Sequence, residues 1–309
     1  MELRHIRYFL VLAEELNFTR AAARLGISQP PLSMQIKQLE QEIGTELFYR
    51  TTNGAELTPA GSAFYTAVQP IAQRLQDAVT TTQEVANGSL GTLRLGYTGT
   101  AMLHPLLRSV IRLYQQQYPK SQLQLSEANS LILLERLQRD ELDIAIVRPP
   151  QVTPADLNMQ ILLTETMVVA LPAEHPCQAM AEIPLLLLQD DFFIVSPASV
   201  SSGLFDAIRA ACFDHGFEPK MWQNAPQIVS ILSLVAANLG VTLVPESAKQ
   251  LAITGLRYRS ISEPTPKVEM ALAYPKLTHS QAAINFSSLI HTLLKRPVNP
   301  DFRFTGRFL

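Results

Sequence analysis

Hydroxyl and amide groups recur in this sequence directly after runs of strand-forming residues, and one arginine joins them. Thr98-Gly99-Thr100 follows a run that ends at Tyr97, and Arg148 comes directly after Asp143–Val147. In open α/β sheets, ligands bind where strands end and helices begin, because free amides and the helix dipole favour negative charge there. These residue types therefore predict an anionic ligand, most simply a small carboxylate. The candidate contacts are Thr98, Gly99, Thr100, Ser130, Arg148, Ser202, Phe205 and Gln227.

Each candidate also has a plain structural interpretation. Thr98, Thr100, Ser130 and Ser202 are ordinary helix-capping residues, which need no ligand. Arg148 precedes Pro149-Pro150, and its guanidinium suits a salt bridge between lobes. Phe205 is of a type that usually lies in a core. The residues alone leave both interpretations open.

Catalytic and metal-binding motifs are missing from the sequence. We find no nucleophile elbow, Ser-His-Asp motif, phosphate loop or GxGxxG segment after a strand. The histidines lack metal-ligand spacing, and Cys177 and Cys212 form no paired redox motif. We therefore expect no enzyme activity, no metal and no cofactor other than the small-molecule ligand.

A second set of polar residues lies near the N-terminus, on the second of two short predicted helices. Thr19 is expected to cap the first helix and Gly26 to end it, whereas Ser28 caps the second helix. The connection Gly26-Ile27-Ser28 has helix-turn-helix spacing. The short and polar groups of the second helix suit a major groove, and its first amides suit a phosphate. The candidate DNA contacts on it are Gln29, Pro30, Ser33, Met34 and Lys37.

Asn53-Gly54 lies between β-tolerant residues and predicts a hairpin. A hairpin in this place is a wing, from which Arg50 or Asn53 reaches the DNA backbone or the minor groove. A small helical bundle and a plain surface hairpin are the alternatives. Residues 1–60 carry six Lys or Arg and seven Glu. Because non-specific affinity grows with the phosphates neutralised, binding requires cations clustered on one face and two copies of the module.

A long helical pattern follows, with Thr58 as its N-cap, Pro59 as its first residue and Asn87-Gly88 at its end. Apolar or small residues recur on this helix at heptad spacing and form a stripe. A stripe on the edge of a small domain must be buried against another surface, and a twofold-related copy of the chain provides that surface. Packing against its own chain is the alternative. We expect a homodimer through this helix. The stripe consists of Phe64, Val68, Ile71, Leu75, Ala78, Thr82 and Val85.

From Leu93 onward, strand-like runs alternate with helical runs, which favours parallel sheets joined by crossover helices. The order permits two subdomains, with the chain crossing near Leu163–Thr166 and returning near Ile261–Pro266. The expected strands are Leu93–Tyr97, Leu123–Ser126, Asp143–Val147, Thr166–Leu171, Phe192–Ser196, Val241–Pro245 and Met270–Tyr274. The expected helices are Leu103–Tyr118, Ser130–Asp140, Gly203–His215, Gln227–Leu239 and Ser280–Lys295.

The composition agrees with a globular chain of two or three domains. Of the 309 residues, 47% are hydrophobic and 17% charged, and the net charge is −2. These values exclude a disordered chain and a polycation that coats nucleic acid by charge alone. No stretch has the pattern of a signal peptide or a membrane span, so we expect a cytoplasmic protein.

The residues from Asn17 to Glu40, with Gly44, Leu47-Phe48 and Leu57–Gly61, resemble the DNA-binding signature of the LysR-type transcriptional regulators. The likeness is close over about the first 65 residues, and length and layout agree across nearly the whole chain. The opening Met1–Phe9 and the Gln-Pro-Pro-Leu-Ser run are most similar to members that sense intermediates of aromatic-compound breakdown. The chain departs from the family at Met34, where arginine is usual, and this bears on operator preference.

The resemblance implies an α/β protein with an N-terminal winged helix-turn-helix, a long linker helix and a two-lobed effector-binding domain like periplasmic solute-binding proteins. Within the family, the positions of Thr100, Ser130, Arg148 and Phe205 border the effector cleft. The implied divisions are 1–58 for the DNA-binding domain, 59–88 for the linker and dimerisation helix, 89–296 for the effector-binding domain and 297–309 for a tail. Lobe I takes 89–163 and 267–296, and lobe II takes 164–266.

The implied function is transcription regulation. Such a protein binds double-stranded operator DNA as a homo-oligomer, usually a tetramer, and alters the access of RNA polymerase when a small organic acid occupies the cleft. Activation is the expected sign, and autorepression is common in the family. The alternatives are a solute-binding protein without a DNA role, which would need export, and an α/β enzyme with an N-terminal extension.

Overall fold

The computed structural model describes residues 1–309 except 52–53, 198–201, 263, 279 and 296–309, and the side chains of Ser202, Gln223 and Asn224 are also outside the description. The chain forms two compact units, Met1–Glu84 and Val85–Leu309. The expected tail and the candidate Asn53 therefore fall outside the described residues. No helix of the described part is long and apolar enough to cross a lipid bilayer.

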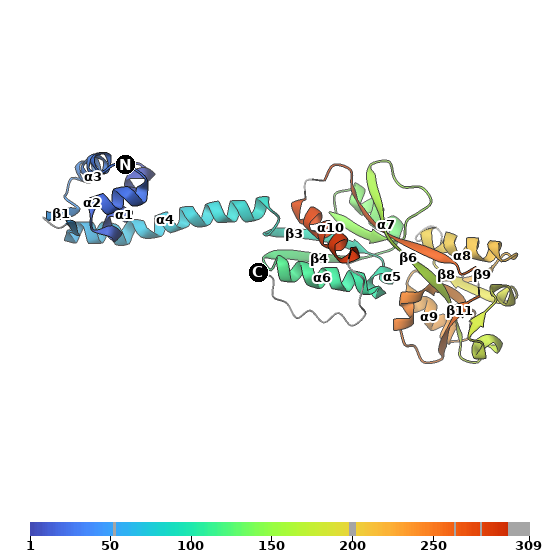
Figure 1. Ribbon diagram of the computed structural model, residues 1–309. Coiled ribbons are helices and arrows are strands. Elements are labelled where there is room, and N and C mark those ends of the chain that lie inside the picture. The colour runs from blue at the N-terminus through green and yellow to red at the C-terminus, as the bar shows by residue number, and fades with distance from the viewer. Residues whose placement is uncertain (52–53, 198–201, 263, 279, 296–309) are drawn as a thin grey trace. The chain divides into compact units, whose positions relative to one another are not determined.

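The first unit is a helical domain with a small hairpin (Figure 1). Its elements are α1 (Leu3–Glu15), α2 (Phe18–Leu25), α3 (Gln29–Ile43), β1 (Phe48–Thr51), β2 (Gly54–Leu57) and α4 (Pro59–Ala86). The predicted hairpin is confirmed, because β1 and β2 pair antiparallel with Thr51 opposite Gly54.

The two helices of the predicted helix-turn-helix form, but the cap of the first is different from the expected one. The Asn17 side chain accepts hydrogen bonds from the amides of Thr19 and Arg20, so Asn17 and not Thr19 is the N-cap. An Asn side chain caps as well as a Thr hydroxyl, and the helix starts two residues earlier in consequence. Gly26 ends α2 with a φ of 70°, as predicted.

An aromatic cluster holds this unit together. The ring of Phe9 lies 5.3 Å from that of Phe48 and 4.9 Å from that of Phe64, so α1, the hairpin and the start of α4 share one core. Leu32, Ile36 and Leu39 of α3 are buried in the same core. The opposite face of α3 is therefore the one that faces outward.

Helix α4 is continuous from Pro59 to Ala86, about 42 Å at 1.5 Å per residue. Thr58 caps it as predicted, because its hydroxyl accepts from the amide of Gly61 at 2.8 Å. Val68 is buried, whereas Ile71, Leu75 and Val85 are 45%, 43% and 56% exposed. Most of the predicted stripe is thus not covered by its own chain within the described residues.

The second unit contains two lobes that share one long strand. Strand β6 (Leu157–Pro172) pairs with β12 (Lys267–Pro275) through its first part and with β10 (Thr242–Pro245) and β11 (Leu256–Ile261) through its last part. The sheet order is β4-β3-β5-β12-β6-β11-β7, with β10 beside β6. Strand β6 therefore carries the chain from lobe I to lobe II, and β12 carries it back to lobe I.

Lobe I places helices on its part of the sheet, and α6 and α10 lie side by side (Figure 1). Its other elements are β3 (Gly91–Tyr97), α5 (Gly99–Leu103), α6 (Pro105–Gln117), β4 (Ser121–Glu127), α7 (Ser130–Gln138), β5 (Ile144–Val147) and α10 (Gln281–Leu294).

Lobe II contains a separate pair of parallel strands, β8 and β9. Its other elements are η1 (Pro176–Ala179), β7 (Glu182–Ile183), η2 (Leu185–Leu188), β8 (Phe192–Val195), α8 (Ser202–Asp214), β9 (Lys220–Asn224), α9 (Ile228–Ala236) and η3 (Glu246–Gln250).

The prediction of parallel sheets is only partly right. Strand β3 is parallel to β4 and β5, but β12 is antiparallel to β5 and β6, and β10 and β11 are antiparallel to β6. Parallel neighbours need a crossover helix between them, whereas antiparallel neighbours do not. The alternation of strands and helices along the sequence therefore indicates only the parallel pairs.

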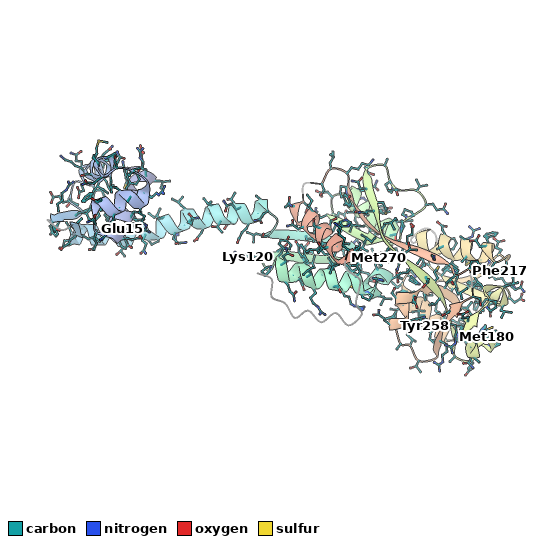
Figure 2. The ribbon with its side chains drawn as sticks, viewed as in Figure 1. Glu15, Lys120, Met180, Phe217, Tyr258 and Met270 are labelled. Carbon is teal, nitrogen blue, oxygen red and sulfur yellow. The ribbon has the colours of Figure 1, made fainter. Side chains whose placement is uncertain are left out.

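Each lobe has its own apolar core. Met270 of β12 and Phe286 of α10 are fully buried in lobe I, and Phe193 is fully buried in lobe II. Figure 2 shows Met270 in lobe I, and Phe217 and Tyr258 in lobe II. The lobes thus fold around largely separate cores, and Leu103 of lobe I also packs against an apolar cluster of lobe II.

Candidate functional site

The outward face of α3 carries the predicted DNA contacts. Gln29, Pro30, Met34 and Lys37 are exposed, and Ser33 is half-buried. The prolines lie in the first turn, where their missing N–H groups remove no intrahelical bond. These side chains thus lie together on one helix surface that the core leaves free.

Arg50 of the wing is held against this helix. Its Nη1 donates to the Ser33 hydroxyl at 3.2 Å, and its guanidinium lies 5.3 Å from the ring centre of Phe18. The guanidinium therefore joins the surface of α3 instead of extending from the hairpin tip. Phe18 was not singled out from the sequence, because nothing in its local pattern indicates a contact with a residue 32 positions away.

A cavity of about 30 Å³ lies between the two lobes. Lobe I contributes Thr98, Gly99, Thr100, Asn129 and Arg148 to its lining, and lobe II contributes Ser196, Leu204, Pro226, Gln227, Ile228 and Ile231. Five of the eight predicted contacts therefore line one cavity. Asn129, Ser196 and the apolar residues of lobe II are not among the predicted contacts, because the ends of strands indicate polar groups of one lobe at a time and not the apolar groups of the facing lobe.

Two of the predicted contacts, Ser130 and Phe205, do not line this cavity. The Ser130 side chain is fully buried, and its hydroxyl accepts from the Arg148 amide at 3.2 Å. Phe205 packs against the core of lobe II. The side chain of Ser202 lies outside the described residues. Ser130 thus fixes the backbone of Arg148 by this hydrogen bond without lining the cavity.

The Arg148 guanidinium is 1% exposed and already has several partners. Nη2 donates to Glu165 Oε2 at 2.6 Å, Nη1 to the Glu269 carbonyl at 3.3 Å, and Nε to the Thr100 hydroxyl at 3.4 Å. Burial lowers the pKa of Arg148, and the Glu165 carboxylate opposes this shift. The guanidinium is therefore fixed in position beside the cavity.

Glu165, which no local sequence pattern indicates, joins the two lobes. Its Oε2 accepts from Arg148 of lobe I, and its Oε1 accepts from the Ser247 amide of lobe II at 3.3 Å. Beside it, the Thr166 hydroxyl donates to Glu246 Oε2 at 2.9 Å. The salt-bridge interpretation of Arg148 is thus realised through the strand that crosses between the lobes.

Gly99 lies against the side chain of Glu127. A Cβ atom at this position would lie 2.8 Å from Glu127 Oε1, the end of a flexible and exposed side chain, so a small shift of Glu127 would make room for it. Helices α7 and α9 also begin at the cavity, and neither Asn129 nor Gln227 caps its own helix with its side chain. The first amides of these two helices are therefore free to meet an anion.

His104 lies next to this region and caps α6, because its Nδ1 accepts from the Leu106 amide at 3.1 Å. Burial lowers the pKa of His104, Arg148 and Arg108 lower it further, and Glu165 raises it. No group of three or more His, Cys, Asp or Glu side chains suited to a metal ion occurs in the described part of the chain.

Comparison with known proteins assigns both halves of the chain. Residues 3–62 match the model "Bacterial regulatory helix-turn-helix protein, lysR family", and residues 86–294 match "LysR substrate binding domain". The chain belongs to the LysR family of transcriptional regulators. It is therefore a DNA-binding regulator of transcription with an effector-binding domain, and not an enzyme.

Relatives in the LysR family cover nearly all of the chain. The transcriptional regulator BudR of Raoultella terrigena is 37% identical over 93% of this chain and 99% of its own. The regulator BenM of Acinetobacter baylyi is 32% identical over 91% of this chain and 92% of its own. The likeness therefore extends over more than nine-tenths of this chain.

Solved LysR structures have the same fold. Full-length CbnR in complex with its target DNA has a TM-score of 0.76 at 22% identity, covering 95% of this chain and all of that one. The effector-binding domain of BenM with its effector benzoate has a TM-score of 0.58 at 25% identity, covering 66% of this chain and 92% of that one. The helix-turn-helix and the two-lobed domain are thus the architecture of the family.

Proposed function

We propose that this LysR regulator binds operator DNA as a homo-oligomer and changes transcription when a small carboxylate occupies the interlobe cavity. The observation that carries the proposal is the convergence of Thr98, Thr100, Arg148 and Gln227 with the first amides of α7 and α9 around one cavity. Hydroxyls, amides and a guanidinium together suit a carboxylate.

The small size of the cavity indicates how such a ligand acts. At about 30 Å³ it holds about two water molecules, and an organic acid needs more room. The carboxylate therefore binds a geometry in which the lobes are further apart. A ligand that prefers one lobe geometry shifts the population toward it, and this is the signal.

The aromatic-compound breakdown group is our finer assignment. It is supported by the opening Met1–Phe9 and by the likeness to BenM, whose effector-binding domain is known with benzoate. We further propose a dimer through α4, a tetramer of two such dimers, activation through contact with RNA polymerase, and action in the cytoplasm, where the DNA is. The domain divisions at 58, 88 and 296 belong to the same proposal.

The operator contacts in the proposal are Gln29, Pro30, Ser33, Met34, Lys37, Arg50 and Asn53. Changing Pro30→Glu together with Ser33→Glu places two carboxylates against DNA phosphates and should abolish a mobility shift with the upstream intergenic DNA. Gln41→Glu with Thr45→Glu adds the same charge near the other end of α3 and should leave most of the binding. Undiminished binding of the first variant contradicts the assignment of α3.

Ligand binding is tested by thermal shift with a panel of aliphatic acids, aromatic acids and their ring-opened products. A specific ligand raises the melting temperature by mass action. We expect at least one carboxylate to do so, and a benzoate-like acid to be among those that do if the finer assignment is right. Stabilisation by neutral compounds alone would contradict the carboxylate proposal.

A further inference from the structure

A second cavity lies in lobe I, at the opposite end of β5 from the interlobe cavity. Its volume is about 220 Å³, and it extends from Ile144, the first residue of β5, whereas Arg148 directly follows the last residue of that strand. Four residues of strand separate these two positions by about 13 Å. The lining consists of Ile144, Tyr274, Thr278, Ala283, Ile284, Ser287 and Ser288.

The chemistry of this cavity differs from that of the interlobe cavity. None of its lining side chains carries a charge. The Ser288 hydroxyl donates to the Ile284 carbonyl, and the Thr278 hydroxyl accepts from the Ser280 amide. The hydroxyls of Tyr274 and Ser287, in contrast, have no hydrogen-bond partner among the described residues. Two free hydroxyls thus face a hollow whose other walls include Ile144, Ala283 and Ile284.

These features define the class of ligand. The lining offers an ion no opposite charge in return for the hydration it would give up, so we expect a neutral ligand. The hollow is open to solvent on the side of Ile284 and Ser288, and its volume of about 220 Å³ accepts one six-membered ring with a small substituent. The hydroxyls of Tyr274 and Ser287 can form hydrogen bonds with a hydroxyl or carbonyl group on that ring. We propose that lobe I binds a neutral, ring-sized, hydroxylated compound of the phenol type at this second site.

The position of the site on α10 connects it to the linker helix. The Asn285 side chain donates from Nδ2 to the Asn87 carbonyl, just beyond the end of α4, at 2.9 Å. Gly88 has a φ of 72°, and a Cβ there would lie 2.8 Å from the Ala282 amide nitrogen. Ala283 and Ile284, which line the cavity, lie in the sequence between Ala282 and Asn285, the two residues of α10 that contact the linker. Occupancy of the site therefore acts on the turn of α10 that holds the end of the linker.

The test uses the full-length protein with phenol as the probe and saturation-transfer NMR with calorimetry as the readouts. We expect saturable phenol binding that persists when the interlobe cavity is saturated with a carboxylate. Ser287→Leu fills the hollow and should abolish binding. Tyr274→Phe keeps the shape and should weaken binding about fivefold, the usual loss for one neutral hydrogen bond.

Ser288→Ala is the matched control, because its hydroxyl already bonds to the Ile284 carbonyl and should leave phenol affinity unchanged. A change in operator affinity on adding phenol, seen in the wild type and lost in Ser287→Leu, supports the link to α4. Three results overturn the proposal: no saturable phenol binding at millimolar concentration, equal binding in wild type and both Ser287→Leu and Tyr274→Phe, or an operator affinity that phenol leaves unchanged. All of them are distinct from failure of the carboxylate site.

Discussion

At the scale of single residues, the Arg148–Glu165 pair links the interlobe cavity to the contact between the lobes. Arg148 lines the cavity, and Glu165 bonds to both lobes. Both side chains are more than nine-tenths buried, and the two charges pair at 2.6 Å. Two buried charges offset each other only while both are present. The pair therefore fixes the guanidinium beside the cavity, and it makes each member dependent on the other.

Arg148→Met leaves the Glu165 carboxylate buried without its counter-charge, and we expect it to cost about 3–5 kcal/mol of unfolding free energy. Arg148→Met with Glu165→Met removes both charges and should recover most of that loss. Urea unfolding of the wild type, the single variant and the double variant measures the difference. A single variant that is no less stable than the double variant would disprove the dependence.

His104 gives the protein a pH dependence of stability. Its pKa is lowered by burial, so the folded state stays neutral where the unfolded state, with an ordinary pKa of about 6.5, takes up a proton. Stability is therefore complete above about pH 6.5 and falls as the pH decreases below it. The facing charges are Arg148 and Arg108, which act in the same direction, and Glu165, which opposes them.

The corresponding prediction concerns His104→Asn, which retains an acceptor for the Leu106 amide but does not titrate. Between pH 7 and pH 5, we expect the melting temperature of the wild type to decrease more than that of the variant. Thermal unfolding at several pH values provides the comparison. Parallel decreases in the two proteins would show that His104 is not responsible.

At the scale of elements, the uncovered stripe of α4 is the main feature. Ile71 and Leu75 are nearly half exposed although the helix is continuous around them. Each Å² of apolar surface that is removed from water stabilises association by about 25 cal/mol. A second copy of α4 is the cover that heptad spacing favours.

Ile71→Glu with Leu75→Glu places carboxylates within this stripe and should convert the protein to monomers, detected by sedimentation. Gln76→Glu with Thr80→Glu adds the same charge on the opposite side of α4 and should leave the oligomer intact. Operator affinity should decrease with the first variant, because one half-site contact remains. A first variant that sediments like the wild type would require another interface.

Local patterns were sufficient for most elements but not for the lobe contacts. The α4 cap at Thr58, the Gly26 stop and the hairpin opposite Gly54 follow from neighbouring residues, and the structure confirms them. Strands β7, β9 and β11 were not expected, because short or mixed runs lack a two-residue period. Glu165 was missed for a different reason: its partners Arg148 and Ser247 are 17 and 82 residues away.

At the scale of the whole molecule, the fold separates two tasks. The first unit carries the proposed DNA surface around α3, and the second carries the interlobe cavity, with Asn87 and Gly88 in contact with α10. We propose that a carboxylate separates the lobes and so changes the geometry of the second unit. In the proposed oligomer on two half-sites, we expect that change to alter how the DNA-binding units are spaced.

DNase I footprinting tests this account most directly. The full-length protein is placed on its upstream intergenic DNA, with and without a carboxylate that thermal shift has shown to bind. We predict a protected region that changes in length or in hypersensitive positions when the carboxylate is saturating. An identical footprint at saturation, or no protection at all, would contradict the account.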